Sequence, residues 1–229
     1  AIKPILFNTE MVRAILDGRK TCTRRILKGA IPFDEKAEYW NVLKKGEWSG
    51  PICVEYFMKQ GSPYKPGDIL YVRETWTEEC GKYYYRADYD SDYLDPCETL
   101  SGGYPASCRN HPGCDGCMAT STRIHWHPSI HMPKEAARIW LKVTDVRVER
   151  LQDVTEDGAK AEGAIDDRGF IHSPENEYDS IHTAREHFTE IWNSTIKKSD
   201  LDRYGWEANP YVFVIEFVKI DKPEEIQNA

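Results

Sequence analysis

The stretch YKPGDILYVRETW, residues 64–76, constrains the fold more than any other part of the sequence. Its Pro-Gly pair predicts a tight turn, and the β-branched and aromatic residues of 69–76 predict a strand directly after it. Alternation along a strand places Glu74 on the same face as Leu70 and Val72. The chain is therefore expected to contain a sheet in which one carboxylate lies among apolar side chains.

The other elements follow from periodicity and from capping residues. The pattern predicts helices at 9–17, 155–163 and 180–196, and further strands at 82–88, 139–150 and 211–220. The segments at about 29–63 and 89–128 show no periodicity, so both are expected to be insertions. This order favours an α+β fold with a mostly antiparallel sheet and flanking helices.

The charge balance limits the partners of the chain. The formal net charge of its 229 residues is -8, which argues against tight, non-specific coating of long nucleic acid. A small basic pocket for one phosphate, nucleotide or base remains compatible with this charge. There is no apolar run long enough for a membrane span and no signal-peptide pattern at the N-terminus, so we expect a cytoplasmic protein without membrane partners. The oligomeric state stays open.

Positive charge is nevertheless concentrated in GRKTCTRR, residues 18–25, which follows the first predicted helix. A run of charges like this is often a solvated turn. The same cations could also form one wall of a pocket for a nucleotide or a nucleobase.

Four motifs together resemble the ASCH-domain family. They are GRKTCTRR, YKPGDILYVRETW, VTEDGAKAEG and YVFVIEF, and the segment 129–163 is similar to the longer ASCH proteins often encoded by bacteriophages and prophages. The resemblance implies a PUA-like β-barrel, here expected as a single domain over residues 1–229 that carries the two insertions. It covers about two thirds of the chain and leaves out the Cys-rich insertion.

The resemblance also implies a reaction. A bacterial branch of the family hydrolyses N4-acetylcytidine with a lysine, a threonine three residues later and a glutamate on a later short helix. The matching positions in this sequence are Lys20, Thr23 and Glu162. Cleaving such an amide needs a nucleophile, a proton acceptor and charge stabilisation. Lys20 would act as the base for the Thr23 hydroxyl, and Glu162 would orient Lys20 or protonate the leaving amine.

Further residues are expected to contact the substrate or to shape its pocket. They are Arg24, Arg25, Glu74, Trp76, Trp126 and His131. We expect Glu74 to be buried and paired with an arginine, Arg25 or Arg73. A carboxylate at that position could also accept a hydrogen bond from the exocyclic amine of a base. Trp76 has a competing interpretation as a core residue.

The second insertion contains a cluster of cysteines. Cys97, Cys108, Cys114 and Cys117 lie within 21 residues, and the Cys-x2-Cys spacing of the last two is typical of a structural zinc site. The sequence therefore predicts one structural zinc that staples the insertion, with His111 as an alternative ligand to one cysteine. Four free thiols in a loop are the competing interpretation.

Three functions remain compatible with the sequence. The first is an amidohydrolase that removes an acyl group from an N4-acylated cytosine compound. The second is a module that binds RNA or a modified base without chemistry. The third is a ribonuclease, in which Lys20 and the arginines stabilise the charge of a phosphorane-like transition state.

Overall fold

The computed structural model describes residues 1–28, 30–32, 39–44, 47–48, 50–53, 62–79, 81–89, 125–166 and 183–223. This part of the chain has a mixed α+β fold with mostly antiparallel strand pairing, as expected from the sequence. The backbone groups into two compact units. The first unit contains residues 1, 17–69 and 141–219, and the second contains 2–16, 70–140 and 220–229. A single domain over 1–229 stays a prediction.

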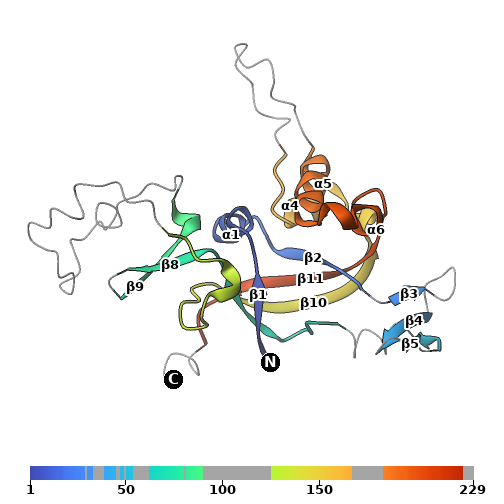
Figure 1. The fold of residues 1–229 in the computed structure, drawn as a ribbon, viewed down its shortest axis with the longest axis horizontal. Coiled ribbons are helices and arrows are strands. Elements are labelled where there is room, and N and C mark those ends of the chain that lie inside the picture. Colours follow the sequence, from blue (N-terminus) through green and yellow to red (C-terminus); the bar gives the residue numbers. More distant parts are fainter. Residues whose placement is uncertain are drawn as a thin grey trace, which may run out of the picture. The chain divides into compact units, whose positions relative to one another are not determined.

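The main strands of the first unit are β2 (Cys22–Ile26), β10 (Trp140–Arg150) and β11 (Tyr211–Ile220). They are adjacent in the order β10, β11, β2, and Figure 1 shows them side by side. β11 runs antiparallel to β2, with Glu216 opposite Cys22 and Val214 opposite Arg24. Most of the basic stretch of the sequence therefore forms an edge of this strand group.

A second, smaller sheet of the first unit contains β3 (Ala30–Pro32), β4 (Tyr39–Lys44), β5 (Glu47–Trp48) and β6 (Ile52–Cys53). β4 pairs antiparallel with each of the other three strands. The prediction that 29–63 is irregular is therefore wrong for these residues. β3, β5 and β6 have only two or three residues, too few to give a periodic signal in the sequence. The six residues of β4 have a strand-like composition that was not recognised.

Five short helices belong to the described part of the first unit. They are η3 (Leu151–Asp153), α4 (Glu156–Ala161), α5 (Ala184–Thr195), η4 (Lys198–Asp200) and α6 (Leu201–Tyr204). Side chains cap the start of α4 and of α5. The Thr155 hydroxyl accepts a hydrogen bond of 3.0 Å from the Gly158 amide at the start of α4. Thr183 forms a reciprocal capping box with Glu186 at the start of α5. The predictions of these two helices are confirmed, with α5 beginning at Ala184.

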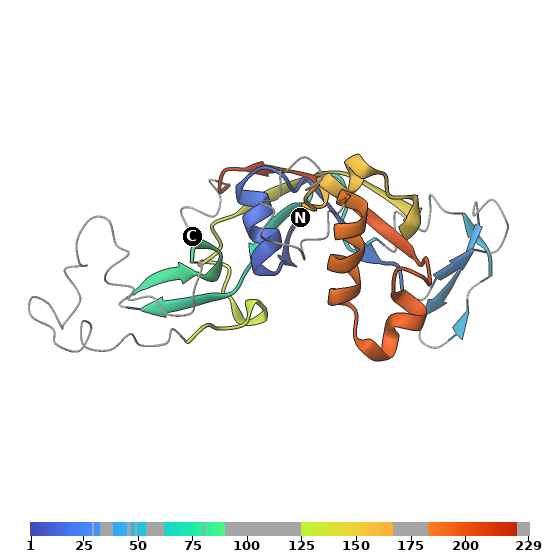
Figure 2. The same ribbon diagram turned by 90° about the horizontal axis from the view of Figure 1, so that it is seen from above.

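Apolar side chains from α4, α5, β11 and the loops beside them form the core of the first unit. α4 packs against α5, as Figure 2 shows. The buried members of this core are Leu151, Val154, Ala159, Ala164, Ala184, Phe188, Trp192, Val212 and Val214. Because Val214 lies opposite Arg24, this core covers the same face of the sheet that carries Cys22 and Arg24.

The described residues of the second unit form short strands, one α-helix and two single-turn helices. Its elements are β1 (Ile2–Leu6), α1 (Thr9–Leu16), β7 (Ile69–Arg73), β8 (Trp76–Glu79), β9 (Lys82–Tyr85), η1 (Arg86–Asp88) and η2 (Ser129–His131). β1 is adjacent to β7, and β8 and β9 form an antiparallel two-stranded ribbon (Figure 2). Asn8 accepts a hydrogen bond of 2.9 Å from the Met11 amide, so it caps α1.

The strand predicted over 69–76 is interrupted. β7 ends at Arg73 and β8 begins at Trp76, so Glu74 and Thr75 lie outside both strands. The Glu74 amide contacts the Met132 sulfur at 3.2 Å instead of a strand partner, and the Thr75 carbonyl accepts from the Arg86 amide. The composition of the stretch is strand-like throughout, and tertiary contacts decide where the strands stop.

The strands in the described ranges do not close into a barrel. None of the helices in the described part of the chain has the length and apolar character that crossing a membrane requires.

Candidate functional site

The centre of the candidate site is a buried ion pair between Lys20 and Glu162. Lys20 lies two residues before the start of β2, and Glu162 is the residue that ends α4. The Lys20 ammonium donates to the Glu162 Oε2 at 2.7 Å and to the Glu162 backbone carbonyl, also at 2.7 Å. The two side chains are only 1% and 6% exposed. Two of the three predicted catalytic residues, 142 positions apart in sequence, are therefore in direct contact.

Local structure explains how the two residues meet. The Thr21 amide donates to the Ala161 carbonyl at 2.8 Å, and this bond ties the start of β2 to the end of α4. Gly163 follows Glu162 with a φ of 94°, a conformation that favours glycine and ends the helix there. The carboxylate thus stays at the helix end, beside the basic stretch.

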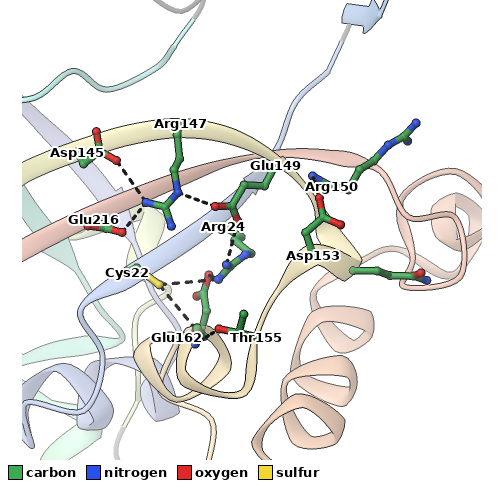
Figure 3. Close-up of polar contacts among 12 residues, drawn as sticks. Cys22, Arg24, Asp145, Arg147, Glu149, Arg150, Asp153, Thr155, Glu162 and Glu216 are labelled. Atoms are coloured by element: carbon green, nitrogen blue, oxygen red, sulfur yellow. Dashed lines mark hydrogen bonds and ion pairs between the residues drawn. The ribbon is translucent and has the colours of Figure 1, made fainter. Parts of the chain in front are cut away.

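Arg24 extends this pair into a longer chain of alternating charges, drawn in Figure 3. Its NH1 lies 3.3 Å from Glu162 Oε1, and its NH2 lies 3.3 Å from Glu149 Oε2. Glu149 in turn accepts from Arg147 Nε at 2.5 Å. Arg147 also pairs with Asp145 and Glu216. This row of alternating charges leads from the interior to the surface. The Arg24 side chain is 3% exposed, and the Arg147 side chain is 41% exposed.

Thr23 is buried in β2, and alternation places it on the opposite face of the strand from Cys22 and Arg24. In the described part of the chain, no hydrogen bond joins the Thr23 hydroxyl to Lys20 or Glu162. Arg25 shares the face of Thr23. Burial lowers the pKa of the Arg25 guanidinium, and the nearby Tyr64 and Glu162 oppose this effect. The catalytic role of Thr23 and the substrate contact of Arg25 stay predictions.

Cys22 is the other nucleophilic side chain near the pair. Its sulfur lies 3.9 Å from Arg24 NH1 and 4.0 Å from the Gly158 carbonyl. Burial, followed by the Glu162 charge, raises the pKa of the Cys22 thiol to about 12. The thiol is therefore protonated at neutral pH and is a poor nucleophile.

Glu74 lies in the second unit and is 1% exposed, as predicted. Its partner is Arg138, at 2.9 Å from Nε to Oε1 and 3.0 Å from NH2 to Oε2. Neither arginine proposed from the sequence, Arg25 or Arg73, takes that place in these contacts. The Arg73 Nε instead donates to the Met132 carbonyl at 2.7 Å. Arg138 is 64 residues from Glu74, so no local pattern identifies it.

The predicted aromatic residues also lie in the second unit. Trp76 contacts the Tyr83 ring at 5.7 Å and the His127 ring at 5.2 Å between centroids. Trp126 contacts Tyr89 at 5.8 Å. The indole N–H groups of Trp76 and Trp126 are buried and find no acceptor among the described residues. His131 is exposed in η2. Their roles as substrate contacts stay predictions.

The cysteines predicted to bind zinc lie outside the described residues. These are Cys97, Cys108, Cys114 and Cys117, together with His111. Among the residues that the structure describes, no group of three or more His, Cys, Asp or Glu side chains could hold a metal ion.

Sequence reasoning missed Glu149, Arg147 and Arg138 as partners of the buried charges. Glu149 and Arg147 lie two residues apart on β10, so a strand with charges at every second position was the available signal. That pattern is also common on a solvated sheet face, and it carries no information about Arg24.

Comparisons of the chain with protein-family models, with curated proteins and with solved structures found no match in any of the three. The resemblance to the ASCH family therefore rests on the four sequence motifs.

Proposed function

We propose that the chain is a PUA-like ASCH protein that hydrolyses the N4-acyl group of a cytosine nucleoside or a related compound. The single observation that carries this proposal is the buried contact between Lys20 and Glu162. The resemblance implies that these two positions belong to one catalytic site. Their contact in a water-excluded place supports that role, because charged groups act more strongly where water is absent.

The geometry of the pair suggests how Lys20 becomes a base. Lys20 and Glu162 share a hydrogen bond of 2.7 Å, and moving one proton along it leaves a neutral amine and a neutral carboxylic acid. The amine can then take the proton of the Thr23 hydroxyl as the Thr23 oxygen bonds to the acyl carbon. When the bond from carbon to N4 breaks, the proton passes from Lys20 to the leaving amine. Water then hydrolyses the ester, which releases the acid and restores Thr23.

Incubation with N4-acetylcytidine, N4-acetylcytosine and related acylated nucleosides tests the proposal, with the products identified by mass spectrometry. We expect the free amine and the carboxylic acid. Lys20→Met and Thr23→Val should each lower kcat by about 10²-fold or more while the substrate still binds, because each removes a role in the transition state. Lys160→Met removes an exposed lysine of α4 and is the matched control, with unchanged kcat.

A second candidate function is the binding of RNA or a modified base without catalysis. The position of Thr23 favours it, because alternation places Thr23 on the other strand face from Arg24 and the described contacts include no bond to Lys20. If no acylated nucleoside is turned over and both variants weaken ligand binding, this second function replaces the first. Cleavage of an RNA substrate by the wild-type protein would instead favour a ribonuclease.

We also propose a structural zinc ion bound by Cys97, Cys108, Cys114 and Cys117, on the evidence of their spacing alone. Elemental analysis of the purified protein should find about one zinc per chain. The double variant Cys114→Ser/Cys117→Ser should lose the metal and lower the melting temperature. Cys53→Ser removes an exposed cysteine outside the cluster and should retain the metal. The proposal would be refuted if the purified wild-type protein contains no zinc and has the same melting temperature as the double variant.

A further inference from the structure

Arg24 lies between two glutamates, and the proposed reaction assigns no role to this arrangement. Its guanidinium lies 3.3 Å from Glu162 and 3.3 Å from Glu149, and its side chain is 3% exposed. Each glutamate has its second oxygen on another cation. The second oxygen of Glu162 accepts from Lys20. The second oxygen of Glu149 accepts from Arg147, as Figure 3 shows. The two carboxylates therefore share one buried guanidinium.

The surroundings leave the guanidinium held mainly by these two carboxylates. Gly158 leaves room for it, since a Cβ at that position would lie 3.4 Å from Arg24 NH2. The Phe188 ring lies 5.8 Å from Arg24 Cζ, a distance that permits a cation–π attraction. Within the described ranges the buried Arg24 Nε finds no acceptor. A guanidinium with one donor unsatisfied is not fixed by a complete set of hydrogen bonds. Competition with Glu149 therefore determines how firmly Arg24 holds Glu162.

We propose that Arg24 and Glu149 are positioning residues for the Lys20–Glu162 pair. This inference rests on the proposed function, since it assumes that the pair is catalytic. Arg24 anchors one oxygen of Glu162 and so keeps the other on Lys20. Glu149 competes for the same guanidinium and weakens this hold.

Several charged groups lie around Glu162. Lys20, Arg24 and Arg25 supply positive charge from β2 and the residues before it, and the Cys22 thiol lies on the same strand. Arg19 donates to the carbonyl of Gly163, the next residue, at 2.8 Å. From β10, Glu149 reaches the cluster through Arg24. From α5, the group that faces Arg24 is the ring of Phe188, which does not ionise.

The first test is the split between kcat and KM for N4-acetylcytidine. Arg24→Met removes the group that anchors one oxygen of Glu162, so kcat should fall about tenfold or more while KM stays near the wild-type value. Glu149→Gln leaves the guanidinium of Arg24 to Glu162, so kcat should stay at the wild-type value or rise. Arg24→Lys keeps a cation at this position and should restore most of kcat. No loss of kcat in Arg24→Met, or an equal loss in Glu149→Gln, overturns the proposal.

The second test does not depend on activity. The rate of reductive methylation at Lys20, read by mass spectrometry, reports how firmly the ammonium is held. Lys20 should react more slowly than the exposed Lys142 in the wild-type protein. Arg24→Met should raise the Lys20 rate roughly tenfold, because hydrogen bonds to charged groups are strong enough to change a local opening equilibrium by that factor. Glu149→Gln should leave it unchanged or lower.

Thr183→Ala is the control for general loss of stability. It removes the cap of α5 in the same unit without touching the ion pair, so Lys20 should react at the wild-type rate. If Arg24→Met leaves the Lys20 rate unchanged, or if Thr183→Ala raises it equally, the positioning role is wrong. If the methylation results are as expected but the wild-type protein hydrolyses no acylated cytosine, the proposed function fails while the positioning of the pair stands.

Discussion

The two units each bury one glutamate, and the two glutamates are held in different ways. Glu74 in the second unit is 1% exposed, and Glu162 in the first is 5% exposed. Both come from motifs that the sequence singles out. Because burial is similar, the partners of each carboxylate decide what it can do.

Glu74 is bound at both oxygens by a single guanidinium. Arg138 donates through Nε at 2.9 Å and through NH2 at 3.0 Å, while its NH1 donates to Asp88 at 2.8 Å. The Tyr85 ring lies 4.0 Å from Arg138 Cζ, which fixes the plane of the guanidinium. An arginine in this geometry holds the carboxylate in one orientation and cannot give up its proton. We call this buried bidentate pair of Glu74 and Arg138 the structural lock of the second unit.

Glu162 is bound by two separate cations instead. Lys20 holds one oxygen and Arg24 holds the other, with one hydrogen bond each. Lysine can give up a proton where arginine cannot. The comparison teaches that two equally buried glutamates differ in chemistry because only one of them shares a hydrogen bond with a group able to transfer a proton.

The largest effect expected from this comparison is the loss of the lock. Glu74→Ala leaves the guanidinium of Arg138 without its buried partner and should lower the free energy of unfolding by about 3 kcal/mol or more, measured with urea. Asp88→Ala removes the exposed partner of the same arginine and should cost about 1 kcal/mol or less. Similar costs for the two variants would show that Glu74 does not act as a buried lock.

Because two cations bind Glu162, removing one of them should cost less stability than the loss of the structural lock. Lys20→Met should lower the free energy of unfolding by about 2 kcal/mol, less than a fully unpaired buried charge would cost, because Arg24 still neutralises Glu162. Lys160→Met, at an exposed position on α4, should change it by about 0.5 kcal/mol or less. A loss for Lys20→Met as large as that for Glu74→Ala would mean that Arg24 does not compensate, and the contrast between the two sites would disappear.

Local signals in the sequence were sufficient for α1, α4, α5, β10 and β11. The caps at Asn8 and Thr155 and the alternation in β10 and β11 lie within a few residues of the elements they define. The same reasoning failed at Glu74, where the predicted strand stops. That break depends on Met132 and Arg138, which lie 58 and 64 residues away and leave no periodic trace.

In the candidate site too, some contacts were expected from the sequence and others were not. The contact between Lys20 and Glu162 was expected only because the motifs resemble a family in which those positions act together. Nothing in the spacing of the residues could place them side by side across 142 positions. The second partner of Arg24 had no such precedent, and a glutamate in an alternating strand such as Glu149 looks like an ordinary solvated residue.

The smallest effect distinguishes the two glutamates by pH. Burial raises the pKa of Glu74 above its usual value of 4.5, and the hydrogen bonds and charge of Arg138 oppose this without overcoming it. The folded protein therefore holds the Glu74 proton more tightly than the unfolded chain does. The contribution of Glu74 to stability is then greatest at low pH, where the carboxyl is protonated in both states. This contribution to stability falls as the pH rises from about 4.5 through the folded-state pKa of Glu74.

The experiment compares wild-type protein with Glu74→Gln, which cannot ionise. Wild-type protein should lose stability relative to this variant over that pH interval, as measured by urea unfolding at a series of pH values. Glu78→Gln removes an exposed carboxylate of β8 and is the matched control for the loss of one carboxylate. A wild-type protein that instead gains stability relative to Glu74→Gln with rising pH would mean that the attraction of Arg138 outweighs burial, and that the lock is favourable in its charged form.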